Sequence, residues 1–124
     1  MTVLLVALGA AVGAPLRYLL DRAVQSRHDS AFPWGTLTVN VVGSLILGVL
    51  IGGATVGAVP GSLVALLGSG LCGALTTYST FGYETVRLFE DGARRHALAN
   101  VVLSVAAALG AAFVAVTLTA PLWP

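Results

Sequence analysis

The stretch Gly73-Ala74-Leu75-Thr76-Thr77-Tyr78-Ser79-Thr80-Phe81 lies inside a run that has no charged residue from Ala31 to Tyr83. Four of its residues are Thr or Ser. Hydrocarbon gives such hydroxyl groups no hydrogen-bond partner, so within a membrane they must pair with other helices or line a path for a polar solute. We therefore look for function at this cluster.

The composition of the chain predicts a membrane protein. Of its 124 residues, 57% are hydrophobic and only 9% are charged, whereas soluble domains carry about 25% charge. A membrane span needs roughly 20 apolar residues, and four such segments fit the sequence, at residues 2–20, 34–53, 62–88 and 96–120. We predict an all-α integral membrane protein with a single four-helix domain over residues 1–124.

The polar residues exclude several functions. The formal net charge of +1 gives no indication of a nucleic-acid partner, and the single cysteine, Cys72, excludes an internal disulfide. No nucleophile–base pair and no set of metal-ligating side chains is visible, so enzymatic activity has no support.

The basic residues predict the orientation in the membrane. All six are Arg, and in a four-span chain all fall on the side of the first and third connections: Arg17, Arg22, Arg27, Arg87, Arg94 and Arg95. Basic residues next to spans are retained in the cytoplasm. We therefore predict that both termini lie outside.

The third predicted span has features of a broken helix. Gly73 lacks a side chain, and the Thr and Ser residues that follow have low or middling helix propensity. A break at membrane depth exposes backbone groups that commonly bind ions. The alternative is a continuous helix in which each hydroxyl bonds back to a carbonyl of its own helix.

Aromatic rings adjoin these hydroxyls. Tyr78 and Phe81 are three residues apart and so share a helix face. Since an aromatic ring has a positive edge, ring edges, hydroxyls and amide groups could together solvate a small anion without a fixed positive charge. Such a stripe is otherwise ordinary core packing.

Other polar residues lie near this face. Asn40, in the second segment, offers two donors and an acceptor, and an interhelical hydrogen bond is its simpler role. Asn100 and Ser104 are weaker versions of the same signal. Arg17 lies near a span end, where snorkelling or pairing is ordinary, and an anion-attracting vestibule is the alternative.

Three motifs resemble the Fluc/CrcB fluoride channels: Gly13-Ala14-Pro15-Leu16-Arg17-Tyr18, Gly35-Thr36-Leu37-Thr38-Val39-Asn40, and Gly70-Leu71-Cys72 followed by the stretch quoted first. They cover the first three segments in order. The resemblance implies an antiparallel dimer with two pores, which exports fluoride passively from the cytoplasm across the bacterial inner (plasma) membrane.

The resemblance also implies roles for individual residues. Backbone carbonyls of Gly73 and Thr76 would hold a structural sodium ion at the dimer centre. The fluoride pore would be formed by Asn40, by the hydroxyls of Ser79 and Thr80, and by the aromatic residues Tyr78 and Phe81. Tyr78 departs from the family, in which many relatives carry Phe.

The charge bias bears on the dimer partner. An antiparallel homodimer needs chains that insert in both directions, whereas six arginines on one side favour a single orientation. We therefore expect an oppositely oriented paralogue as the partner, with self-association as the alternative.

Two other functions remain open. A small multidrug-type antiporter has a similar size but needs a carboxylate at membrane depth, and here Asp21 and Glu84 sit at span ends. A non-conducting membrane subunit would use Asn40 and the hydroxyls as packing contacts only.

Overall fold

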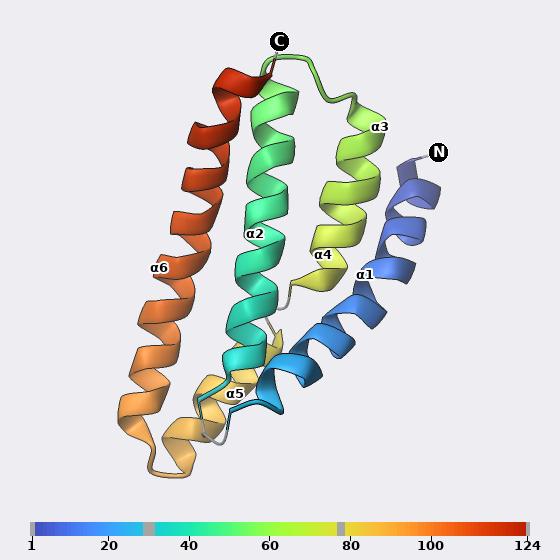
Figure 1. The fold of residues 1–124 in the computed structure, drawn as a ribbon. Coiled ribbons are helices and arrows are strands. Elements are labelled where there is room, and N and C mark those ends of the chain that lie inside the picture. The colour runs from blue at the N-terminus through green and yellow to red at the C-terminus, as the bar shows by residue number, and fades with distance from the viewer. Residues whose placement is uncertain (1, 29–31, 77–78, 124) are drawn as a thin grey trace.

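The computed structural model describes residues 2–28, 32–76 and 79–123, and every regular element in this part of the chain is helical (Figure 1). The elements are α1 (Thr2–Gln25), α2 (Trp34–Thr55), α3 (Gly61–Leu63), the π-helix η1 (Val64–Cys72), α4 (Gly73–Leu75), α5 (Ser79–Glu90), α6 (Arg94–Thr119) and the short 3-10 helix η2 (Ala120–Leu122).

Four helical segments are long and apolar enough to cross a membrane: Thr2–Gln25, Trp34–Thr55, Gly61–Glu90 and Arg94–Leu122. They match the four segments predicted from the sequence, with ends that differ by a few residues. Helices suit this environment because they satisfy their backbone polar groups internally, where lipid offers no partner. The prediction of an all-α chain is confirmed for the described residues, and four of the helical segments are compatible with membrane spans.

The third span changes direction near its middle. Helices α3, η1 and α4 follow one another without interruption to Leu75. Thr76 then has extended backbone angles (φ −78°, ψ 159°), and the next helix, α5, begins at Ser79. Figure 1 shows α5 as a separate short helix beneath α2, beside the far end of α1. The π-helical stretch, whose turns are wider than α-helical turns, was not predicted.

Glycines bring the first and third spans into backbone contact. Helix α1 packs along η1 and α4, while α2 packs along α6. A Cβ added to Gly70 would lie 2.7 Å from the carbonyl oxygen of Val6 and 3.0 Å from the Cα of Gly9. Small residues permit this close approach, which gives dispersion contacts where burial from lipid supplies little driving force.

This contact gives a first prediction. Gly70→Ala would force backbone against backbone, and we expect the overpacking to destabilise the protein by about 1–3 kcal/mol. Gly110→Ala is the matched control, because nothing lies within 4 Å of a Cβ at Gly110. Thermal unfolding in detergent measures both. Equal melting temperatures for the two variants would contradict the role of the α1–η1 contact.

The chain reverses at glycines after α2 and α5. Gly57 (φ 77°) and Gly92 (φ 84°) adopt left-handed backbone conformations, and the following residues, Ala58 and Ala93, donate N–H hydrogen bonds back to Gly53 and Leu88 at 2.8 and 2.9 Å. This pattern terminates a helix and satisfies its last carbonyls.

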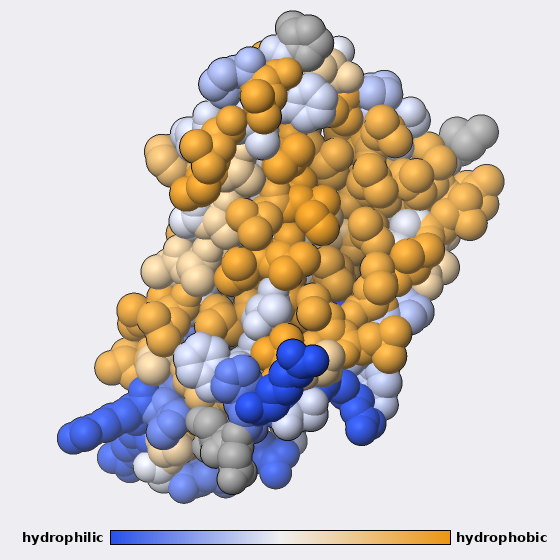
Figure 2. Space-filling model, viewed as in Figure 1, coloured by the Kyte–Doolittle hydropathy of each residue, from blue (hydrophilic) through white to orange (hydrophobic). Residues whose placement is uncertain are grey.

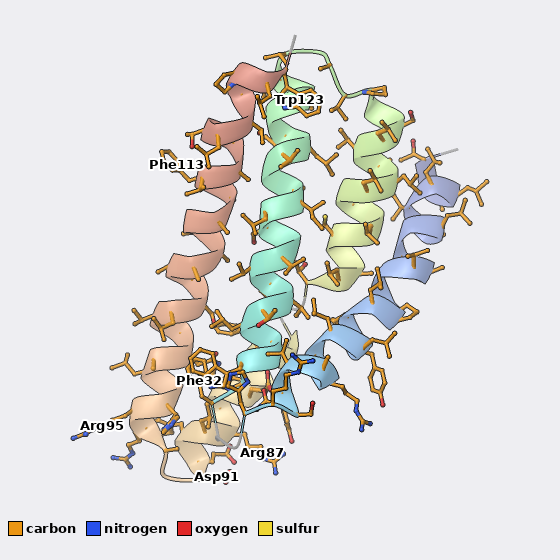
Figure 3. All side chains as sticks on the ribbon, in the orientation of Figure 1. Phe32, Arg87, Asp91, Arg95, Phe113 and Trp123 are labelled. Atoms are coloured by element: carbon orange, nitrogen blue, oxygen red, sulfur yellow. The ribbon has the colours of Figure 1, made fainter. Side chains whose placement is uncertain are left out.

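Hydrophilic residues gather at one end of the molecule, below a broad apolar surface (Figure 2). Figure 3 shows Arg87, Asp91 and Arg95 at this end and Trp123 at the other. In Figure 1 the two marked ends of the chain lie away from α5. The arginines therefore define one charged end of the bundle.

Candidate functional site

A cavity of about 320 Å³ opens between the second, third and fourth spans. Helix α2 contributes Asn40 and Ser44, the third span contributes Cys72, Gly73 and Thr76, α5 contributes Phe81, and α6 contributes Ser104. The remaining lining residues are Gly43, Leu47, Gly68, Val105 and Ala108. None of these residues carries a charge.

Four of the predicted site residues therefore meet in one place. Asn40, Gly73, Thr76 and Phe81 come from three different helices, yet all line this cavity. Thr76 follows α4 with extended backbone angles, and Phe81 belongs to α5, which begins at Ser79. The cavity thus brings an amide side chain, hydroxyl-bearing residues and an aromatic ring into an otherwise largely apolar lining.

The local structure at Thr76 explains how its backbone is presented. The Thr76 N–H and hydroxyl both donate to the Cys72 carbonyl oxygen, at 2.9 and 2.8 Å. The Thr76 hydroxyl thus bonds back to its own helix, as the continuous-helix alternative expected of each hydroxyl. The last carbonyls of a helix have no intrahelical partner, and both Gly73, at the start of α4, and Thr76, at its C-cap, line the cavity.

A second, smaller cavity of about 130 Å³ lies toward the charged end. It is lined by Arg17, Tyr18 and Asp21 of α1, Thr36 and Val39 of α2, and Thr80 of α5. The structure thus places Arg17 and Thr80 together, apart from Asn40 and Phe81. Asp21 shares this space, so the local charge is mixed rather than purely positive.

Glu84 makes a contact that the sequence did not reveal. The hydroxyl of Thr36 donates to a Glu84 carboxylate oxygen at 2.5 Å, which joins α2 to α5. The sequence analysis placed Glu84 only as an acidic residue at a span end. The only feature of the sequence that distinguished Glu84 was its position as the first charged residue after the neutral run from Ala31 to Tyr83.

Asn100 and Ser104 belong to a polar network between α6 and α5. Ser104 donates to the Asn100 side-chain oxygen at 3.1 Å, and the Asn100 amide donates to the Thr85 hydroxyl at 2.8 Å. Thr85 in turn donates to the Phe81 carbonyl oxygen at 2.8 Å. Sequence reasoning noticed Asn100 and Ser104 but missed Thr85, which no motif distinguishes from other threonines.

Two predicted pore positions are not placed. Tyr78 lies outside the described residues. Ser79 begins α5, and the structure does not describe its side chain.

The fold and the cavity together define a small multi-pass membrane protein with an uncharged, largely apolar cavity between its helices, to which a few polar side chains contribute. Residues 4–116 match the family described as CrcB-like protein, Camphor Resistance (CrcB). The chain belongs to this family, as its motifs predicted.

Several similar proteins carry the name of a fluoride-specific ion channel. The chain is 60% identical to the Fluoride-specific ion channel FluC 1 of Streptomyces avermitilis, over 99% of both chains. It is also 60% identical to FluC 1 of Frankia casuarinae, again over 99% of both chains. Identity to FluC 2 of Rhodococcus jostii is 50%, over 96% of this chain and 99% of that one. This family consists of ion channels, and the chain is not an enzyme.

Proposed function

We propose that the chain forms a fluoride-selective channel that lets cytoplasmic fluoride leave the cell passively and so lowers its toxicity. The observation that carries this proposal is the uncharged cavity in which Asn40, Thr76 and Phe81 meet. The names of the relatives supply the identity of the ion.

The chemistry of the cavity suits fluoride. This ion is small and strongly hydrated, so a pore must replace its water with close donors, yet bind it weakly enough for release. The Asn40 amide, neighbouring hydroxyls and the edge of Phe81 can donate without a fixed positive charge. Within this proposal, Tyr78, Ser79 and Thr80 complete the pore, and the Arg17 cavity is a vestibule that attracts anions.

The change of direction at Thr76 is proposed to be the break implied by the family resemblance. Carbonyl oxygens at such a point are hard, neutral donors, which are the donors that sodium prefers. At Gly73 the backbone is open, since a Cβ there would meet only the Gly68 carbonyl oxygen, at 3.9 Å. The carbonyls of Gly73 and Thr76 therefore fit a structural sodium ion, which would supply a fixed positive charge between two chains.

We propose an antiparallel dimer with two pores, in which the partner is an oppositely oriented paralogue rather than a second copy. Support comes from the positions of the six arginines, which all lie in or next to the first and third connections, and from the hydrophilic residues that gather at one end in Figure 2. This end is proposed to be cytoplasmic in the inner membrane, with both termini outside. Numbered names, FluC 1 and FluC 2, occur among the relatives, and this numbering is compatible with two kinds of chain.

The orientation has a direct test. Tags inserted beside Gly57 and Gly92, in turns at opposite ends of the bundle, are labelled from outside in cells that express this chain alone. We expect labelling beside Gly57 only. Equal labelling at both positions would show dual insertion and remove the argument for a paralogue.

The function is tested by fluoride efflux from liposomes. The purified chain is reconstituted alone and with a candidate paralogue, in sodium buffer and in buffer with a large organic cation instead. We expect rapid efflux from the assembled complex and slower efflux without sodium. Retention of fluoride by the assembled complex would instead support a non-conducting subunit.

The antiporter alternative is tested in the same vesicles. Coupled export of cations requires an ionisable carboxylate in the transport path, and the lining of the large cavity contains none. We therefore expect that, at a fixed membrane voltage, fluoride efflux is the same with and without an opposing proton gradient. Uptake of an organic cation driven by the proton gradient would favour the antiporter.

A further inference from the structure

Two adjacent residues of α5 each accept a hydrogen bond from a neighbouring helix. Glu84 accepts a hydrogen bond from Thr36 of α2, and Thr85 accepts one from Asn100 of α6. Adjacent residues on a helix point about 100° apart, so the two contacts approach α5 from different directions. Together they fix both the position of the helix and its rotation about its own axis.

Each contact joins a fully buried side chain, Thr36 or Asn100, to a half-buried side chain of α5. Among the described residues, the three largest fully buried side chains are Val39, Asn100 and Thr36. Two of the three are thus the polar partners of α5. A buried hydrogen bond between fully satisfied groups rigidifies its surroundings, because breaking it leaves a buried polar group without a partner.

The network of Asn100 starts and ends at the large cavity. Ser104 lines the cavity and donates to Asn100, and the network continues through Thr85 to the carbonyl oxygen of Phe81, another residue of the lining. Asn100 itself has 0% of its surface exposed and is not a lining residue. It can therefore act on the cavity only through the residues that it holds.

We propose that Asn100 is a positioning residue that, through Thr85, sets the rotation of α5 and so aims the ring of Phe81 into the pore. Residues 81 and 85 are four apart and share a helix face, so rotation of α5 at Thr85 carries Phe81 with it. This inference rests on the proposed function, since its effect is read as fluoride flux.

The test is a set of double-mutant cycles. Asn100→Leu and Thr85→Val remove the contact between α6 and α5 while keeping side-chain size. We expect each to lower fluoride efflux per assembled protein by roughly two- to tenfold, the range that loss of one hydrogen bond produces. The double variant should lose little more than either single variant, because both break one interaction.

A second cycle separates positioning from simple stabilisation. In a Phe81→Ile background the network has no ring to aim, so Asn100→Leu should change efflux less than about twofold. A purely structural role would lower the yield or the melting temperature and reduce efflux by the same factor in both backgrounds. That outcome would overturn the proposal.

Thr117→Val is the matched control. The Thr117 hydroxyl, also on α6, bonds only to carbonyls of its own helix, at 3.0 and 3.1 Å, and its loss should leave efflux unchanged. If Asn100→Leu does not assemble, the cycle with Phe81→Ile is measured with Thr85→Val instead. Hydrogen exchange gives a readout independent of flux, with faster exchange of α5 amides in Thr85→Val than in Thr117→Val.

The outcomes distinguish the two proposals. If the unmodified complex conducts no fluoride, the proposed function fails and this inference fails with it. If the unmodified complex conducts and neither Asn100→Leu nor Thr85→Val alters efflux, only the positioning role is wrong. Unchanged exchange of α5 amides in Thr85→Val would also count against it.

Discussion

Replacing Asn40 with aspartate is expected to reduce fluoride efflux by two orders of magnitude or more. The change keeps the shape of the side chain but places a negative charge on the wall of the large cavity. At a separation of about 5 Å and an effective dielectric constant of about 20, two like charges repel by roughly 3 kcal/mol. Each 1.4 kcal/mol is a tenfold change, and no basic side chain is among the described residues that line the cavity.

The measurement is fluoride efflux from liposomes, normalised to assembled protein by size-exclusion chromatography. Ser26→Asp is the control, because it adds the same charge at an exposed position after α1, where water and salt screen it. Its efflux should match that of the unmodified protein. Efflux through Asn40→Asp that equals the control would show that the ion does not pass Asn40.

Phe81→Ile is expected to lower fluoride efflux by about tenfold, equivalent to about 1.4 kcal/mol in the barrier. Isoleucine keeps the apolar character of the site and much of its volume, so the fold should be retained. The substitution removes the positive edge of the aromatic ring. A dehydrated anion would therefore lose a favourable contact at this position.

Phe113→Ile makes the same chemical change elsewhere. Phe113 is 70% exposed on α6 and points away from the other helices (Figure 3), so its replacement should leave efflux unchanged. Melting temperatures of both variants check that assembly is intact. Equal losses in the two variants would attribute the effect to general packing rather than to the ring at Phe81.

The architecture was predictable because its signals are local. A span of about 20 apolar residues can be recognised from its own sequence, without knowledge of the other spans. The positions of the six arginines in the sequence likewise place them all on one side of a four-span layout. The motifs around Asn40 and Thr76 likewise identified the family before any contact was known.

The interhelical contacts were not predictable, because they depend on how each helix is rotated. Thr36 and Glu84 are 48 residues apart, and Asn100 and Thr85 are 15 residues apart, and neither pair follows a helical spacing. The π-helical geometry of Val64–Cys72 shifts the faces of the third span relative to a regular α-helix, so a helical wheel drawn from the sequence would misplace its residues. Thr80 lies on the separate helix α5 and lines the Arg17 cavity rather than the cavity lined by Asn40.

The placement of both chain ends on the same side of the bundle limits how genes for such proteins can be fused. A short hydrophilic linker from the end of α6 to the start of another four-helix unit stays in one aqueous compartment. The second unit would then enter the bilayer in the same sense as the first. A single polypeptide carrying two inverted units would need one additional membrane-crossing helix between them.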